Sequence, residues 1–139
     1  MPTDQDLFNE LSFYTLSHPS PAFIHQHVVD AFTAQHANEQ SKPIATVFAL
    51  IGLYLHVEKG FTGKQVQKAH MQLAKQRKQW PLLNPPMGCG ALGITQVLAV
   101  PPGKDRDEMI RNWCVSVWES WKETQNQIRE LAKMELDIR

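Results

Sequence analysis

Histidine is the residue type with which this chain could do chemistry. Three of its six histidines, His27, His56 and His70, fall on three successive predicted helices. Imidazole is the commonest protein metal ligand, and its unperturbed pKa lies near neutral pH. A group of histidines in a helical core therefore indicates a metal site or a pocket that handles protons. No catalytic residue can be assigned from the pattern.

The heights of these histidines follow from helix geometry. Folding the second predicted helix onto the third about residue 40 places His56 level with Ile24, just below His27. Folding the third onto the fourth about residue 61 places His70 level with Gly52. The imidazoles then lie within about one helical turn, roughly 5–6 Å along the axis. Imidazoles spread over this height can still bind one metal ion, at metal–nitrogen distances of about 2.0–2.1 Å, if their side chains converge.

The second predicted helix offers two histidines, and only one of them can easily join the others. His25 and His27 lie on opposite flanks of its core face, each about 80° from the centre at about 100° per residue. We favour His27 because Asp30 follows at i+3, as a ligand or as the carboxylate that orients the imidazole. Glu58, near the end of the third helix, is a further candidate. The predicted zinc or iron site consists of His27, Asp30, His56 and His70.

Two other interpretations of the histidines stay open. In the first, they are hydrogen-bonded core groups of a non-enzymatic interaction module. In the second, His70 is a buried base without metal, and His27 is paired with Asp30. The Gly88-Cys89-Gly90 loop could expose a thiol, but no base or cation adjoins it, so an incidental loop cysteine is favoured. Cys114 is expected to be inert core.

Capping signals place the helices that would carry these residues. Thr3 with Asp6 and Thr62 with Gln65 resemble capping boxes, and Gly60 is typical of a helix end. The first four helices are predicted to begin near residue 3, at 21, at 43 and at 62, and to end near 14, 37, 59 and 80. Residues 81–94 hold three prolines and three glycines and predict a loop, followed by a short helical stretch capped by Thr95.

The predicted fold is all-α, a single-domain antiparallel bundle of about five helices with a long last one. That helix begins near Asp105 and runs to the end, roughly 50 Å against roughly 25 Å for the second and third. Beyond Trp121 its apolar stripe is thin, so residues 122–139 either fray or pack on another subunit. We predict a homodimer held by Trp121, Ile128 and Leu131.

Composition excludes several classes of partner. Acidic and basic side chains number 14 each, so charge gives no reason to expect binding to nucleic acid or to an anionic membrane. The longest apolar run, residues 44–55, is too short to span a bilayer. The acidic residues near Met1 differ from a signal peptide, and two cysteines are too few for a disulfide framework. We therefore expect a cytoplasmic protein.

Several segments resemble an uncharacterised bacterial family, one of the domains of unknown function. The resemblance extends from Leu11 to Trp80, with a weaker match at 113–118. The matching segments are residues 14–19 (YTLSHP), 23–31 (FIHQHVVDA), 52–55 (GLYL) and 63–71 (GKQVQKAHM). The resemblance implies a small soluble helical protein. It implies no activity, cofactor or catalytic residue.

Overall fold

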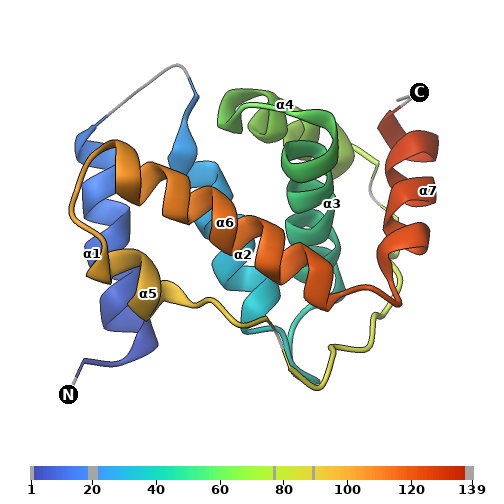
Figure 1. Cartoon of the computed structure of the whole chain (residues 1–139). Coiled ribbons are helices and arrows are strands. Elements are labelled where there is room, and N and C mark those ends of the chain that lie inside the picture. Colours follow the sequence, from blue (N-terminus) through green and yellow to red (C-terminus); the bar gives the residue numbers. More distant parts are fainter. Residues whose placement is uncertain (1, 19–21, 77, 89, 137–139) are drawn as a thin grey trace.

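A computed structural model describes residues 2–18, 22–76, 78–88 and 90–136. Over these ranges the chain forms seven α-helices and no strand (Figure 1), which confirms the all-α prediction but corrects the helix count of about five. The helices are α1 (Asp4–Ser17), α2 (Ile24–Gln35), α3 (Pro43–Lys59), α4 (Gly63–Ala74), α5 (Ile94–Ala99), α6 (Lys104–Ser120) and α7 (Gln125–Leu136).

The predicted capping signals start α1 and α4. The Thr3 hydroxyl accepts from the Asp6 N–H at 3.1 Å, while the Asp6 carboxylate accepts from the Thr3 N–H at 2.9 Å. Thr62 and Gln65 form the same reciprocal pair at the start of α4. Gly60 ends α3 with φ 72°, a left-handed conformation that glycine adopts without strain. The two capping boxes and this glycine therefore determine three helix boundaries, the starts of α1 and α4 and the end of α3.

Other boundaries differ from the prediction. The predicted cap at Ser20-Pro21 lies outside the described residues, and α2 begins only at Ile24. α4 ends at Ala74 rather than near residue 80. Gly93, not Thr95, precedes α5, and the side chain of Gln96 accepts a hydrogen bond from the Gly93 N–H.

The start of α4 is joined to the residue pair before α2. The Gly63 N–H donates to the Ala22 carbonyl at 2.5 Å, and the Lys64 ammonium lies 4.4 Å from the centre of the Phe23 ring. A Cβ at position 63 would lie 1.7 Å from the Phe23 carbonyl oxygen, so only glycine permits this approach. Phe23 itself has φ 49°, rare for a bulky residue. The junction sets α4 against α2.

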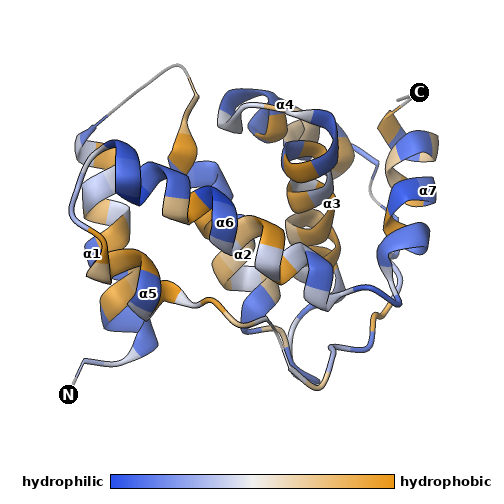
Figure 2. Cartoon of the chain, in the orientation of Figure 1, coloured by the Kyte–Doolittle hydropathy of each residue, from blue (hydrophilic) through white to orange (hydrophobic). Residues whose placement is uncertain are grey.

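The core lies between α2, α3 and α6. In Figure 1, α6 crosses in front of α2 and α3, α1 and α5 lie on one side, and α4 and α7 lie on the other. α3 is apolar over nearly its whole length (Figure 2). Its residues 49–55 are all buried. No described helix has both the length and the apolar content needed to cross a membrane.

The prediction of one continuous helix from Asp105 to the C-terminus is wrong, because the helix breaks at residues 121–124. The Trp118 carbonyl accepts from the Trp121 N–H at 3.2 Å and from the Gln125 side-chain amide at 2.9 Å. α7 then turns back onto α3 and α4, where Ile128 is fully buried. A straight helix would have carried that side chain away from the core. No glycine or proline marks the break, and the burial of apolar side chains of α7 favours it.

This break also changes the predicted tail. The chain itself covers Trp121 and Ile128, which are 1% and 0% exposed, and Leu131 is partly buried against the same core. The stripe that predicted a homodimer is thus packed within its own chain. Self-association stays a prediction, but its proposed interface does not protrude.

Candidate functional site

The predicted site residues lie where α2 and α3 pack antiparallel. Asp30 and His27 are one turn apart on α2, and Gly52 and His56 are one turn apart on α3. Asp30 contacts Gly52, and His27 contacts His56. The two contacts therefore form successive levels between the helices. His70 reaches the first level from α4, beside Gly52, as helix geometry predicted.

His27 and His56 stack directly. Their ring centroids are 3.5 Å apart and their planes differ by 15°. The turn at Gly60 brings the Phe61 carbonyl back over the end of α3, where the His56 Nδ1–H donates to it at 3.0 Å. That assignment leaves the lone pair of His56 on Nε2. His27 is 3% exposed, and its Nδ1 has no hydrogen-bond partner among the described residues.

His70 is held at both ring nitrogens. Its Nε2–H donates to the Phe48 carbonyl of α3 at 2.7 Å, and its Nδ1 faces the amide nitrogen of Gln26 at 3.5 Å. The Phe48 and His70 rings also stack, 5.5 Å between centroids. His70 is partly buried rather than fully buried.

Asp30 is the buried carboxyl group of the cluster. It is 2% exposed, and the Gln26 amide nitrogen donates to its Oδ1 at 3.1 Å. Its Oδ2 has no hydrogen-bond partner among the described residues. Oδ2 lies against Gly52, where an added Cβ would be 2.0 Å from Oδ2 and 3.2 Å from His70 Nε2. Burying an unpaired carboxylate is unfavourable, so this oxygen requires a proton or a cation.

Burial sets the charge state of the cluster. It lowers the pKa of His27 to about 3, with smaller contributions from His56 and the Arg111 charge. Burial likewise lowers the pKa of His56 and of His70, each opposed in part by its carbonyl partner. Burial raises the pKa of Asp30 well above its usual value, opposed in part by the Gln26 hydrogen bond. The imidazoles are therefore neutral, the form in which they bind metals.

In their present rotamers, the side chains of the cluster do not converge on one point where a metal ion could bind. Among the described residues, no three histidine, cysteine, aspartate or glutamate side chains are arranged to hold a metal ion. The stack explains this, since imidazole lone pairs lie in the ring planes and the planes of His27 and His56 are nearly parallel. One of these rings must rotate before both can reach one ion.

The other candidate ligands lie elsewhere. His25 faces α1, where its Nδ1 is 3.0 Å from the Thr15 hydroxyl, so it does not join the cluster. Glu58 accepts from Trp118 Nε1 and Arg129, and it connects α3 to α6 and α7. Cys89 is outside the described residues. Cys114 is fully buried, and burial raises its pKa, which makes it an unreactive thiol.

Sequence reasoning missed Gln26 and the contact role of Gly52. Gln26 precedes Asp30 by four residues, the spacing at which helical side chains hydrogen-bond, so this signal was present. Gly52 is a lone glycine inside an apolar helix, a position that often marks a close approach.

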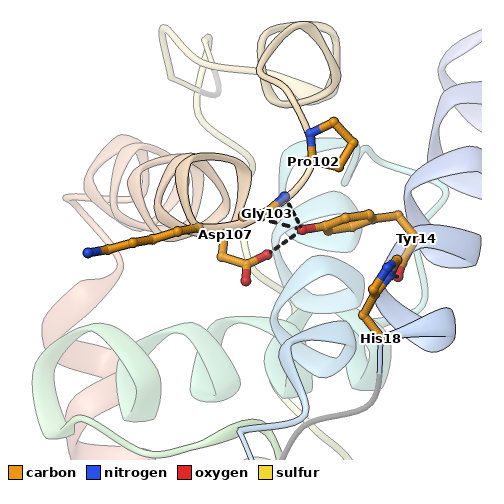
Figure 3. Close-up of a pocket in the computed structure, with 6 residues that line it drawn as sticks. Tyr14, His18, Pro102, Gly103 and Asp107 are labelled. Carbon is orange, nitrogen blue, oxygen red and sulfur yellow. Dashed lines mark hydrogen bonds between the residues drawn. The ribbon is translucent and has the colours of Figure 1, made fainter.

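A separate pocket of about 480 Å³ lies between the end of α1 and the start of α6 (Figure 3). The Tyr14 hydroxyl donates to Asp107 Oδ1 at 2.8 Å and accepts from the Gly103 N–H at 3.0 Å. The His18 Nδ1–H donates to the Tyr14 carbonyl. The side chains that line this pocket are thus hydrogen-bonded mainly to its own walls, and the pocket shares no residue with the histidine cluster.

Comparison with known proteins identifies a family but no activity. Residues 3–122 match the model of a family of unknown function (DUF5946), so the predicted resemblance to such a family is confirmed. No curated protein and no solved structure matches the chain. Because the match covers most of its length, the chain belongs to DUF5946.

Proposed function

We propose that this member of the DUF5946 family binds a transition metal ion, zinc or iron, in the cluster of His27, Asp30, His56 and His70. One observation carries the proposal. A fully buried carboxyl oxygen, Asp30 Oδ2, lacks a partner among the described residues in a cluster of neutral imidazoles. A divalent cation would balance its charge and use the imidazole lone pairs.

The tethering of His56 supports the same proposal. Metal-binding histidines usually donate their second ring N–H to a carbonyl or carboxylate, which fixes the tautomer and the ring orientation. The His56 Nδ1–H does so to Phe61, and Nε2 makes no hydrogen bond to any described residue. Its free lone pair is thus held in place before any ion arrives.

His27 is the side chain that must move. Its Nδ1 has no hydrogen bond to lose among the described residues, and rotating the ring would give up the stack on His56. Such a rotation would direct a nitrogen toward Asp30, one turn away on the same face of α2. A site with three protein ligands keeps a position for water or a small molecule, which a metal can activate.

Metal content tests the proposal directly. Protein purified without an affinity tag, reconstituted with zinc or iron(II) and freed of excess metal, should retain about one ion per chain. His27→Ala and Asp30→Ala should abolish retention. His36→Ala is the matched control, because His36 is exposed and bonds to Asp4 instead.

The opposite result is equally clear. Retention far below one ion per chain for both metals would exclude the proposal. The histidines would then be structural core groups, and chelators would leave the melting temperature unchanged.

A further inference from the structure

We infer that Gln26 and His70 form a positioning pair for Asp30, and that His70 orients the metal site rather than binding the ion. This inference rests on the proposed function for its metal part. It is based on which polar atoms of the cluster already have hydrogen-bond partners among the described residues and which have none.

His70 has partners for both nitrogens. Its Nε2–H donates to Phe48 at 2.7 Å, which leaves Nδ1 as the acceptor that faces Gln26. To bind a metal, His70 would have to give up one of these contacts. Its ring is also stacked on Phe48, which opposes rotation. His70 is therefore the least available imidazole of the three.

Gln26 joins His70 to Asp30. An amide nitrogen carries two hydrogens, so that of Gln26 can donate to Asp30 Oδ1 at 3.1 Å and to His70 Nδ1 at 3.5 Å. The pair holds one carboxyl oxygen and leaves Oδ2 for a ligand. Gly52 allows the carboxyl group to lie in this position, because a Cβ there would be 2.0 Å from Oδ2.

The remaining atoms define the ligand set. They are Asp30 Oδ2, a nitrogen of His27 and Nε2 of His56. Two histidines and one carboxylate are the donors of open catalytic sites, for non-haem iron(II) and also for zinc. This composition indicates an ion with room for a further small ligand, rather than a closed structural site.

The first test uses metal-free protein and needs no binding. Long-range ¹H–¹⁵N NMR should show His70 as the Nε2–H tautomer, and Gln26→Leu should shift the Nδ1 resonance. Gln72→Leu, an exposed position on the same helix as His70, is the control and should leave it unchanged. An Nδ1–H tautomer, or a Nδ1 resonance unaffected by Gln26→Leu, would overturn the positioning pair.

The second test distinguishes a ligand from a positioning residue. Cobalt(II)-loaded His70→Gln should keep the visible spectrum and the stoichiometry of the wild type, with roughly 10–100-fold weaker binding. His56→Ala should lose the spectrum. Loss of stoichiometry in a His70→Gln protein that is folded by circular dichroism would show that His70 is a ligand. If the wild type takes up no cobalt, zinc or iron, the proposed function fails, and the NMR result alone decides the positioning pair.

Discussion

Gly52 of α3 lies against the carboxyl group of Asp30 of α2 with no space between them for a methyl group. A Cβ at this position would be 2.0 Å from Oδ2 and 2.7 Å from Cγ of Asp30. The contact lies at the level of the candidate site. Both the spacing of α2 and α3 and the position of the Asp30 carboxyl group therefore depend on Gly52.

Gly52→Ala should therefore destabilise the protein. In a helix interior this change normally gains about 1 kcal/mol, because alanine is the better helix former. Here the methyl group must displace Asp30, and overpacking of a core costs about 1–3 kcal/mol. Urea denaturation should show a net loss of stability.

A double-mutant cycle provides the control. In an Asp30→Ala background the carboxyl group is gone, and Gly52→Ala should be neutral or stabilising. Additive effects of the two substitutions would mean that the clash is relieved elsewhere.

Acid should destabilise the fold through its buried histidines. The pKa of His27 is near 6.5 when unfolded and about 3 when folded, so the unfolded state binds the extra proton between these values. Stability is then present above pH 6.5 and falls as the pH drops toward 3, by up to about 4 kcal/mol from this residue. The lowered pKa values of His56 and His70 act in the same direction. Unfolding midpoints of wild type and His27→Phe should diverge over this window. Parallel curves would contradict the burial of a neutral His27.

Asp30 should act in the opposite direction. Its folded pKa is raised, so the folded state holds a proton that the unfolded state has lost, and stability decreases as the pH rises above the usual carboxyl range. In metal-free protein, Asp30→Asn should remove this decrease. A variant whose pH–stability curve above pH 4 matches the wild type would show that Asp30 is not buried in its protonated form. Glu119→Gln, at an exposed position, is the carboxyl control.

The packing of α7 on its own chain can be tested at Ile128. This side chain is fully buried, so Ile128→Ala should cost about 2–5 kcal/mol. Met134 on the same helix is 73% exposed, and Met134→Ala should change stability by no more than about 0.5 kcal/mol. Equal effects at both positions would mean that α7 does not pack as described.

Glu58 and Arg129 should stabilise the docking of α7 by a small amount. Arg129 Nη2 donates to Glu58 Oε2 at 2.7 Å, Glu58 also accepts from Trp118, and the Arg129 hydrogen bond lowers the pKa of Glu58. Both side chains are about 30% exposed, so Arg129→Ala should cost about 1 kcal/mol, and less at high salt. Lys133→Ala, which breaks the exposed pair with Glu130 at 3.9 Å, is the control. If Arg129→Ala lost no more stability than Lys133→Ala, the ion pair with Glu58 would not stabilise the docking of α7.

The heights of the histidines were predictable from sequence to within about one helical turn, because they depend on helix rise and on turns whose positions capping residues mark. His70 lies beside Gly52 for this reason. His56 was predicted level with Ile24 but stacks on His27, three residues further along α2. The stack of His27 on His56 was not predictable, since it depends on side-chain torsions that packing selects. The break at residues 121–124 carries no glycine or proline, and it allows Ile128, Ala132 and Leu136 of α7 to be buried.

The position of α6 determines when the histidine cluster becomes enclosed during synthesis. The Cys114 thiol on α6 contacts the His27 carbonyl across 87 residues of sequence, and Arg111 of α6 acts electrostatically on His27 and His56. On a ribosome, α2, α3 and α4 emerge well before α6. The nascent chain therefore presents the histidine cluster to solvent until α6 has also been translated. Enclosure of the site therefore follows the synthesis of the helices that carry the histidines, because it requires α6.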